Sequence, residues 1–192
     1  MTVTLWTIQD YTQWINMQKT GFLYGNPDFV DEDFVEPYRW MIEQMEIRIG
    51  TKPSFNSVPL WAWYRWEGKK KRPDLRRSDH LPPGTKGVRI EFLIDDSLVL
   101  LSDFMNWHCV LNYCYLGETY EDWEHFEKKL EKEGLSCCLE KPLPHAGYHQ
   151  EIVKSWEHIF NVDISDEESY IQATFWELSL KNVVNVKEFI AR

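Results

Sequence analysis

The sequence predicts an α+β fold, in which a mixed, mostly antiparallel central sheet is flanked by about five helices. One observation is the order of the elements: strand, helix, strand, helix, several strands, then helices and strands, without a regular βαβ alternation. The other is the apolar content, since 43% of the 192 residues are hydrophobic and ten are tryptophan. A chain of this size and content can bury one large core, so residues 1–192 are expected to form a single globular domain.

The first 24 residues predict strand, helix and strand. Residues 3–8 are rich in β-branched and aromatic side chains, which favour a strand. Asp10 stands three residues before Gln13, a spacing typical of a helix N-cap. Gly21 is expected to end the helix, because glycine adopts the left-handed conformation without steric cost. Residues 22–24 then predict a short second strand.

Residues 31–49 give the clearest helical pattern in the chain. Apolar side chains recur there every three or four positions, at Phe34, Tyr38, Met41, Ile42, Met45 and Ile49. Pro37 must lie in the first turn, where its missing amide costs little. The sequence VPLWAWYRW at residues 58–66 then predicts a strand.

Residues 67–87 form the one long irregular segment, because proline and glycine interrupt it repeatedly. A loop of this length in a compact domain is usually functional or mobile. It carries the basic run KKKRPDLRR, in which Asp74 lies between Arg72 and Arg76. These two arginines either form a bidentate grip for an anion or belong to a solvated loop that balances a negative surface.

The densest apolar run follows at residues 88–101. Val88, Ile90, Phe92 and Ile94 alternate with more polar residues, which predicts a strand with one buried face. Residues 95–97 (DDS) predict a turn, and residues 98–101 (LVLL) a strand covered on both faces. We therefore expect a hairpin in the middle of the sheet. Ser102 or Asp103 would cap the helix that follows.

The second half of the chain adds helices and then strands. Residues 119–134 predict a helix that Thr119 caps and whose inward residues are Tyr120, Trp123, Phe126 and Leu130. Residues 149–160 predict a further short helix. From residue 170 to residue 189 the pattern returns to strands, in which Gln172 and Glu177 lie on opposite faces.

Charge and composition exclude several classes of protein. The net charge is −10 and the pI about 5.1, so nucleic-acid binding is disfavoured. The chain has no apolar run long enough to span a membrane and no signal-like start, which together predict a soluble, cytoplasmic protein. Cys137, Cys138, His145 and His149 lie close in sequence, but Pro142 and Pro144 make this a loop and adjacent cysteines rarely share one ion. No metal site is expected.

Two groups of residues are candidates for a site. His108 lies near a helix start, so it is either a general base or phosphate ligand, or a structural histidine that donates to a neighbouring backbone or carboxylate group. Trp61, Trp63, Trp66 and Trp107 are either a stacking platform for a planar ring or core residues.

Six segments carry a family resemblance: LWTIQ, PLWAWYRW, RPDLR, VRIEF, LLSDFMNWHCVLN and IQATFWELSLKNVV. Together they resemble, over essentially the whole chain, a bacterial domain-of-unknown-function family, the one numbered 3841. The resemblance implies membership of that family, but it does not indicate any particular activity.

A much weaker likeness is to the ADP-ribosyltransferase fold. Many members open with a strand carrying a polar residue, then a helix and a glycine, and end with a strand holding a catalytic Glu. Thr7 and Gln9 would fill the first place, and the strand from residue 170 the last. Trp6 stands where several families have His, and Gln172 stands nearest the catalytic carboxylate, with Glu177 the only nearby acid.

The resulting hypothesis is a nucleotide- or NAD-binding domain of ADP-ribosyltransferase-like architecture, with or without activity. Its candidate ligand-binding residues are Trp6, Thr7, Gln9, Arg72, Arg76, Trp107 and Gln172, and its candidate catalytic residues are His108 and Glu177. NAD is the candidate cofactor. The alternative is a non-catalytic module that binds a protein partner through exposed tryptophans. Whether the protein is an enzyme stays open.

Overall fold

The computed structural model describes residues 1–55, 57–78, 80–136 and 141–192. The chain divides into two compact units, which we describe separately. Met1–Leu101 and Asp163–Arg192 form what we call the sheet unit, and Ser102–Val162 form the helical unit. The predicted α+β class is confirmed by a six-stranded sheet, a two-stranded sheet and five α-helices in these described ranges.

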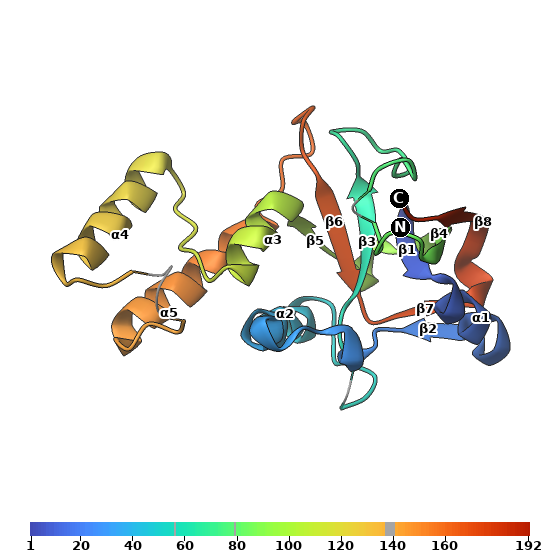
Figure 1. The fold of residues 1–192 in the computed structure, drawn as a ribbon, viewed down its shortest axis with the longest axis horizontal. Coiled ribbons are helices and arrows are strands. Elements are labelled where there is room, and N and C mark those ends of the chain that lie inside the picture. Colours follow the sequence, from blue (N-terminus) through green and yellow to red (C-terminus); the bar gives the residue numbers. More distant parts are fainter. Residues whose placement is uncertain (56, 79, 137–140) are drawn as a thin grey trace. The chain divides into compact units, whose positions relative to one another are not determined.

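The six-stranded sheet has the order β5-β6-β3-β1-β4-β8 (Figure 1). Its strands are β5 (Leu100–Asp103), β6 (Ile171–Phe175), β3 (Leu60–Arg65), β1 (Thr2–Asp10), β4 (Lys86–Asp95) and β8 (Val183–Ile190). β1 pairs antiparallel with β3 and β4, β3 with β6, and β4 with β8. The small sheet joins β2 (Phe22–Tyr24) to β7 (Glu177–Ser179).

One face of the large sheet carries the main core, because alternate residues of its strands are apolar. Buried members from the sheet are Leu5, Leu60, Ala62, Val88, Ile90, Phe92, Ile94, Ala173 and Phe175. Met17 from α1 (Tyr11–Thr20) and Leu23 and Leu178 from the small sheet belong to the same cluster. α1 and the small sheet therefore cover this face.

The other face is covered by α2 (Val35–Arg48) and by the loop that follows β3. The Thr174 hydroxyl on β6 lies 4.0 Å from the Met41 sulfur on α2. Toward β4, the Arg89 side chain donates from Nη1 to the Pro73 carbonyl oxygen at 2.7 Å. A Cβ added at Gly87 would lie 2.5 Å from a Leu81 methyl group, so the loop packs directly on the strand there.

The predicted helix boundaries hold at α1 and are shifted at α2. The Asp10 carboxylate accepts from the Thr12 amide at 2.7 Å, and Gly21 ends α1 with φ at 84°. The pattern at residues 31–49 begins instead with a 3-10 turn, η2 (Glu32–Phe34), whose first amides Asp31 caps, and α2 follows. Pro37 lies in the first turn of α2, as predicted.

The predicted central hairpin at residues 88–101 is wrong. β4 lies between β1 and β8, while β5 lies beside β6 at the far edge of the sheet. Nine residues of β1, Thr2 to Asp10, pair with β4 and occupy one of its sides, and β8 occupies the other. The turn η3 (Asp96–Leu98) therefore leads the chain away from β4 rather than back along it.

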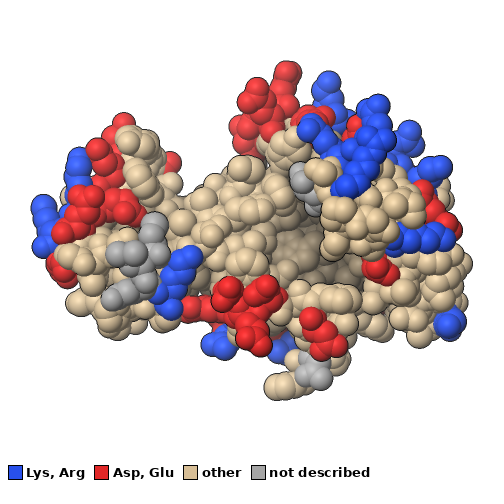
Figure 2. Space-filling model, in the orientation of Figure 1, with Lys and Arg blue, Asp and Glu red and all other residues tan. Residues whose placement is uncertain are grey.

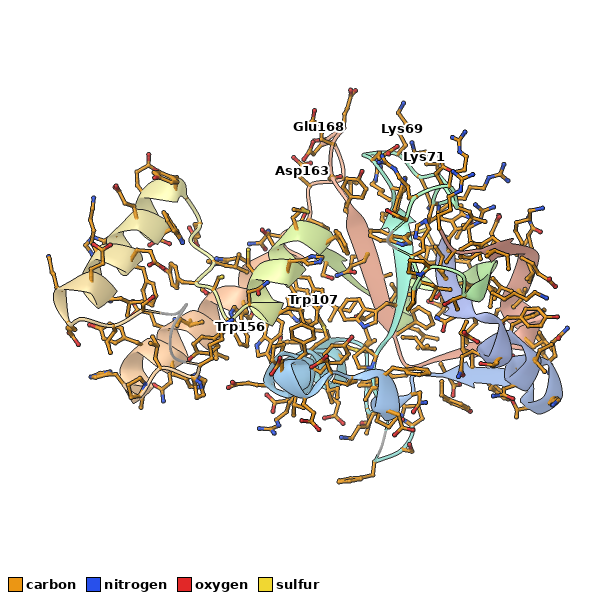
Figure 3. All side chains as sticks on the ribbon, viewed as in Figure 1. Lys69, Lys71, Trp107, Trp156, Asp163 and Glu168 are labelled. Atoms are coloured by element: carbon orange, nitrogen blue, oxygen red, sulfur yellow. The ribbon has the colours of Figure 1, made fainter. Side chains whose placement is uncertain are left out.

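The helical unit contains α3 (Phe104–Leu111), α4 (Tyr120–Lys132), α5 (Ala146–Ser155) and the 3-10 turn η4 (Trp156–Phe160). Asp103 caps α3 by accepting from the Asn106 amide at 2.8 Å. Trp107 on α3 and Trp156 on η4 are both buried (Figure 3). The indole of Trp156 donates to the Cys114 carbonyl oxygen at 3.0 Å.

On α4 the predicted inward face is half right. Phe126 and Leu130 are buried, whereas Tyr120 and Trp123 are exposed, to 69% and 39%. These two rings lie at the start of the helix and pack against each other, with centroids 5.6 Å apart. No helix in the described part of the chain is both long enough and apolar enough to cross a membrane.

Candidate ligand-binding site

Two cavities lie in the sheet unit, and the loop after β3 borders both. The first has a volume of about 660 Å³, and we call it the basic cavity. Its lining consists of Glu67, Lys71, Arg72, Pro73, Asp74, Leu75, Arg76, Arg89, Asn185 and Lys187. Both the loop and two neighbouring strands, β4 and β8, therefore contribute to it.

Arg89 is the central charge of the basic cavity. It lies on β4 with only 8% of its surface exposed, and its Cα partner on β8 is Lys187. Paired residues on neighbouring strands point to the same face of a sheet, so these two cations lie side by side. Burial lowers the pKa of Arg89, and the positive charge of Arg72 lowers it further. The cavity therefore concentrates positive charge at a partly dehydrated position.

The carboxylates of the cavity are already bound to other cations. Asp74 accepts from Arg76 Nη2 at 2.6 Å and from Arg76 Nε at 2.9 Å, which holds its pKa well below the usual range. Glu67 binds Lys71 at 2.6 Å and Arg77 at 2.7 Å, and hydrogen bonds from both lower its pKa. Neither carboxylate is left to neutralise Arg72 or Arg89.

Arg72, Arg89 and Lys187 form no ion pair within the described parts of the chain. Of the predicted pair, Arg76 is bound to Asp74, whereas Arg72 is one of these three cations. The sequence analysis did not select Arg89 or Lys187. Each of them is a cation within a strand whose alternate residues are apolar, which is unusual enough to be noticed in the sequence. The sequence does not show, however, that β8 is the strand beside β4.

We call the second cavity, of about 780 Å³, the aromatic cavity. Rings line it from several elements: Tyr24, Phe29, Tyr38, Trp61 and His80. Its other lining residues are Ile8, Gln9, Asp10, Thr12, Gln13, Gly25, Asn26, Val30, Val58, Pro59, Leu60, Leu81, Pro82 and Thr85. Asp10 is the one Asp or Glu among these described residues, and none of them is Lys or Arg.

The two cavities are neighbours on the sheet. Ile8, which lines the aromatic cavity, is the Cα partner of Arg89, which lines the basic cavity. The loop joins them as well, because a His80 ring nitrogen lies 2.9 Å from the Asp74 carbonyl oxygen. A ligand that reaches both cavities would thus cross only one strand spacing, about 5 Å.

Thr7 and Gln9 form a short hydrogen-bond chain beside the aromatic cavity. The buried Thr7 hydroxyl donates to the Trp61 carbonyl oxygen at 2.7 Å and accepts from Gln9 Nε2 at 2.7 Å. Gln9 lines the cavity, and Thr7 lies behind it. Both predicted residues therefore belong to one feature, with Thr7 supporting Gln9.

Trp6 and Gln172 lie on the opposite face of the sheet from Thr7 and line neither cavity. Trp6 pairs with Trp63, and Trp63 pairs with Gln172, so the three form a row across β1, β3 and β6. Trp6 and Gln172 are 7% and 5% exposed. The Trp6 indole N–H and the Gln172 side-chain nitrogen have no hydrogen-bond partner in the described chain. The structure thus separates these two predicted residues from Thr7 and Gln9.

The proposed tryptophan platform is also divided. Trp63 and Trp66 pack edge to face at 4.7 Å, and Trp66 contacts Tyr170 at 5.3 Å. Trp61 lines the aromatic cavity, where its ring meets Tyr38 edge to face at 6.2 Å. Trp107 is buried on α3 and lines neither cavity. Of the four, Trp61 is the one that a ligand in a described cavity can contact.

The two candidate catalytic residues lie outside both cavities. His108 is an exposed residue of α3, and its Nδ1 lies 2.8 Å from the Phe104 carbonyl oxygen one turn earlier. Glu177 is exposed on β7, paired with Tyr24. Burial, followed by the charge of Glu177, raises the pKa of Tyr24, which lines the aromatic cavity. Glu177 thus lies beside Tyr24, a lining residue of the aromatic cavity, without lining the cavity itself.

Charges of both signs gather at the end of the sheet unit from which the loop emerges. Figure 2 shows a group of Lys and Arg beside a group of Asp and Glu there. Lys69 and Lys71 belong to the first group, and Asp163 and Glu168 to the second (Figure 3). The backbone joins the two segments, because the Gly68 amide donates to the Ser169 carbonyl oxygen at 2.7 Å. The basic cavity is thus bordered by acidic surface.

No group of three or more His, Cys, Asp or Glu residues suited to a metal ion is found where the structure describes the chain. Cys137 and Cys138, which the sequence analysis considered with His145 and His149, lie outside the described residues. The Nδ1 of His149 lies 2.6 Å from the Tyr113 hydroxyl.

Comparison with known proteins gives one match. No curated protein and no solved structure matches the chain. The model of a family described as "Domain of unknown function (DUF3841)" matches residues 4–184, which include the residues lining the aromatic cavity and all lining residues of the basic cavity except Asn185 and Lys187. The chain therefore belongs to the DUF3841 family.

Proposed function

We propose that the sheet unit binds a phosphorylated small molecule of the nucleotide type, whose anionic groups occupy the basic cavity. The observation that carries this proposal is the set of Arg72, Arg89 and Lys187, three cations without an ion-pair partner in the described chain. Of the three, Arg89 is buried while Arg72 and Lys187 are exposed, and a buried cation is costly unless an anion compensates it. Phosphate supplies that compensation, and two arginines can bind it with paired hydrogen bonds.

Size and charge favour a small ligand over a polymer. The protein carries a net charge of −10, and an acidic segment lies next to the basic loop, so a long polyanion would be repelled. A cavity of about 660 Å³ falls within the range of small-molecule sites. The aromatic cavity beside it offers rings on which a base can pack.

NAD is one ligand that fits this description, since it combines a pyrophosphate with two planar rings. The proposal concerns binding and contains no transfer step. Glu177 and His108, the candidate catalytic residues, line neither cavity, so neither is given a role in chemistry.

Thermal-shift measurements with pyrophosphate, ADP and NAD test the proposal. A ligand present at 100 times its Kd stabilises the folded state by about 2.7 kcal/mol, which is readily detected. We expect all three compounds to raise the Tm, and ADP to raise it more than adenosine at the same concentration. If none of the three raises the Tm at millimolar concentration, the proposal is wrong.

The alternative, a module that binds a protein through exposed tryptophans, has a narrower basis. Of the ten tryptophans, all of them within the described residues, only Trp123 is an exposed residue, at 39%. It pairs with Tyr120 at the start of α4. We therefore give preference to the ligand-binding function.

A further inference from the structure

The aromatic cavity contains one polar side chain whose orientation is fixed by its neighbours. The Trp61 carbonyl oxygen can only accept a hydrogen bond, so the Thr7 hydroxyl must donate to it. The single hydrogen of that hydroxyl is then used, and its oxygen can only accept from Gln9. It follows that the nitrogen of the Gln9 amide, and not its oxygen, faces Thr7.

This arrangement leaves Gln9 with two groups for a ligand: the carbonyl oxygen Oε1 as an acceptor and the second N–H as a donor. The Gln9 amide can therefore form two hydrogen bonds with a planar ligand: its Oε1 accepts from a donor on the ligand, and its N–H donates to a neighbouring acceptor. Primary carboxamides and amino-substituted nucleobases have an edge with such a donor and acceptor. A carboxylate does not, since it can only accept.

The lining of the cavity points to the same class of group. Among the described residues no Lys or Arg lines it, and Asp10 is the one Asp or Glu that does. Asp10 caps α1 through the Thr12 amide and hydroxyl, at 2.7 and 2.6 Å. An anionic group would thus meet a carboxylate and no cation. The rings of Tyr38 and Trp61, which pack edge to face, supply apolar surface for a flat, uncharged or cationic ring.

We propose that the aromatic cavity binds a planar ring bearing an amino or carboxamide group, that Gln9 recognises that group, and that Thr7 positions Gln9. This inference deepens the proposed function, because it names the ring portion of the ligand whose phosphates occupy the basic cavity. A nicotinamide and an adenine share the required chemistry, and the experiment below distinguishes them.

The test uses ring fragments without phosphate, so that its outcome does not depend on the basic cavity. Ligand-observed NMR on the full chain compares nicotinamide with 3-acetylpyridine, and adenosine with purine riboside, all of them uncharged. In each pair the first compound has the N–H₂ group and the second lacks it. We expect at least one of the amino compounds to bind about tenfold more tightly than its partner, since one hydrogen bond to a buried polar group contributes about 1.4 kcal/mol. The pair that shows the difference identifies the ring.

Three variants assign the effect to residues. Gln9→Leu should abolish the preference, while Gln18→Leu, on the exposed side of α1 and outside both cavities, should leave it unchanged. Thr7→Val should reduce the preference without removing it, because Gln9 is then present but free to rotate. Circular dichroism and the Tm verify that each variant is folded.

The outcomes separate this inference from the proposed function. If the amino and non-amino compounds bind equally, or if Gln9→Leu keeps the preference, the inference is wrong, whatever pyrophosphate does. If the preference is found but pyrophosphate does not bind, the proposed function fails and the ring site remains.

Discussion

Arg89 on β4 and Lys187 on β8 are direct partners across the sheet, so that a buried and an exposed cation lie next to each other in the lining of the basic cavity. Like charges in this position destabilise a sheet. The arrangement is reasonable for a protein whose bound form contains an anion at that place, because the anion converts the repulsion into attraction.

Removing one of the two charges should therefore stabilise the empty protein and weaken ligand binding. We expect Lys187→Gln to raise the free energy of unfolding by about 0.5 kcal/mol, measured by urea denaturation without ligand. The same variant should bind ADP more weakly. Lys181→Gln, on η5 (Leu180–Asn182) and outside both cavities, is the control and should change neither quantity. A lower free energy of unfolding for Lys187→Gln would show that Arg89 and Lys187 do not repel each other in the folded protein.

The hydrogen-bond chain behind the aromatic cavity should also contribute to stability. Thr7→Val keeps the shape of the side chain but leaves the Trp61 carbonyl oxygen without its donor. We expect a cost of about 1–3 kcal/mol in the free energy of unfolding. Thr4→Val, on the same strand, provides the comparison and should be near neutral, because valine favours strands. Equal effects at the two positions would contradict the hydrogen bond's role.

Gly68 fixes the contact between the basic loop and the acidic segment. Its φ is +65°, and a Cβ placed there would lie 1.9 Å from the Glu167 carbonyl oxygen. At Gly21 φ is +84°, and nothing lies within 4 Å of such a Cβ. An alanine there would therefore pay only the cost of the left-handed backbone conformation, without a steric clash. Gly21→Ala should cost about 1–2 kcal/mol, and Gly68→Ala clearly more, in parallel denaturation experiments. A smaller loss for Gly68→Ala than for Gly21→Ala would mean that the two segments do not pack as described.

The ion pair between Asp74 and Arg76 can be tested by titration. Hydrogen bonds from the Arg76 side chain, followed by its backbone amide, lower the pKa of Asp74 below its ordinary value of 3.8. A carboxyl group with a lowered folded-state pKa contributes stability above pH 3.8, and this contribution is lost as the pH falls through the folded-state value. Carbon-detected NMR of the Asp74 carboxyl group should show the lowered pKa.

In Arg76→Gln the pKa of Asp74 should return toward 3.8. Arg77→Gln should instead chiefly raise the pKa of Glu67, because a hydrogen bond that lowers it is lost. If Asp74 titrates near 3.8 in the unmodified protein, Arg76 is not neutralised and must be counted among the cations open to an anion.

Local sequence was sufficient to predict most individual elements. Asp10 and Gly21 mark the two ends of α1, and Thr119 marks the start of α4, because capping depends on residues within one turn. Strand pairing depends on distant residues, and there the prediction failed. Nothing within residues 88–101 indicates that β1 and β8 take both sides of β4, which places β5 at the far edge.

The same limit explains the candidate site. Arg72 was selected because it stands in a basic loop, but its partners Arg89 and Lys187 come together only through the pairing of β4 with β8. Thr7 and Gln9 were selected as a pair two residues apart on one strand, and a hydrogen bond joins their side chains. Gln172 and Trp6 were selected on the same likeness and lie on the opposite face, since neighbouring residues of a strand alternate in direction.

The most direct test of the central claim is isothermal titration calorimetry of ADP with three proteins: the unmodified chain, Arg72→Gln and Lys181→Gln. Arg72 forms no ion pair with any residue that the structure describes, so its substitution should leave the fold intact while removing a charged hydrogen-bond donor from the basic cavity. We predict that Arg72→Gln binds ADP about tenfold more weakly and that Lys181→Gln binds like the unmodified protein. Equal affinity in all three proteins, or no binding to the unmodified chain at millimolar ADP, would contradict the account.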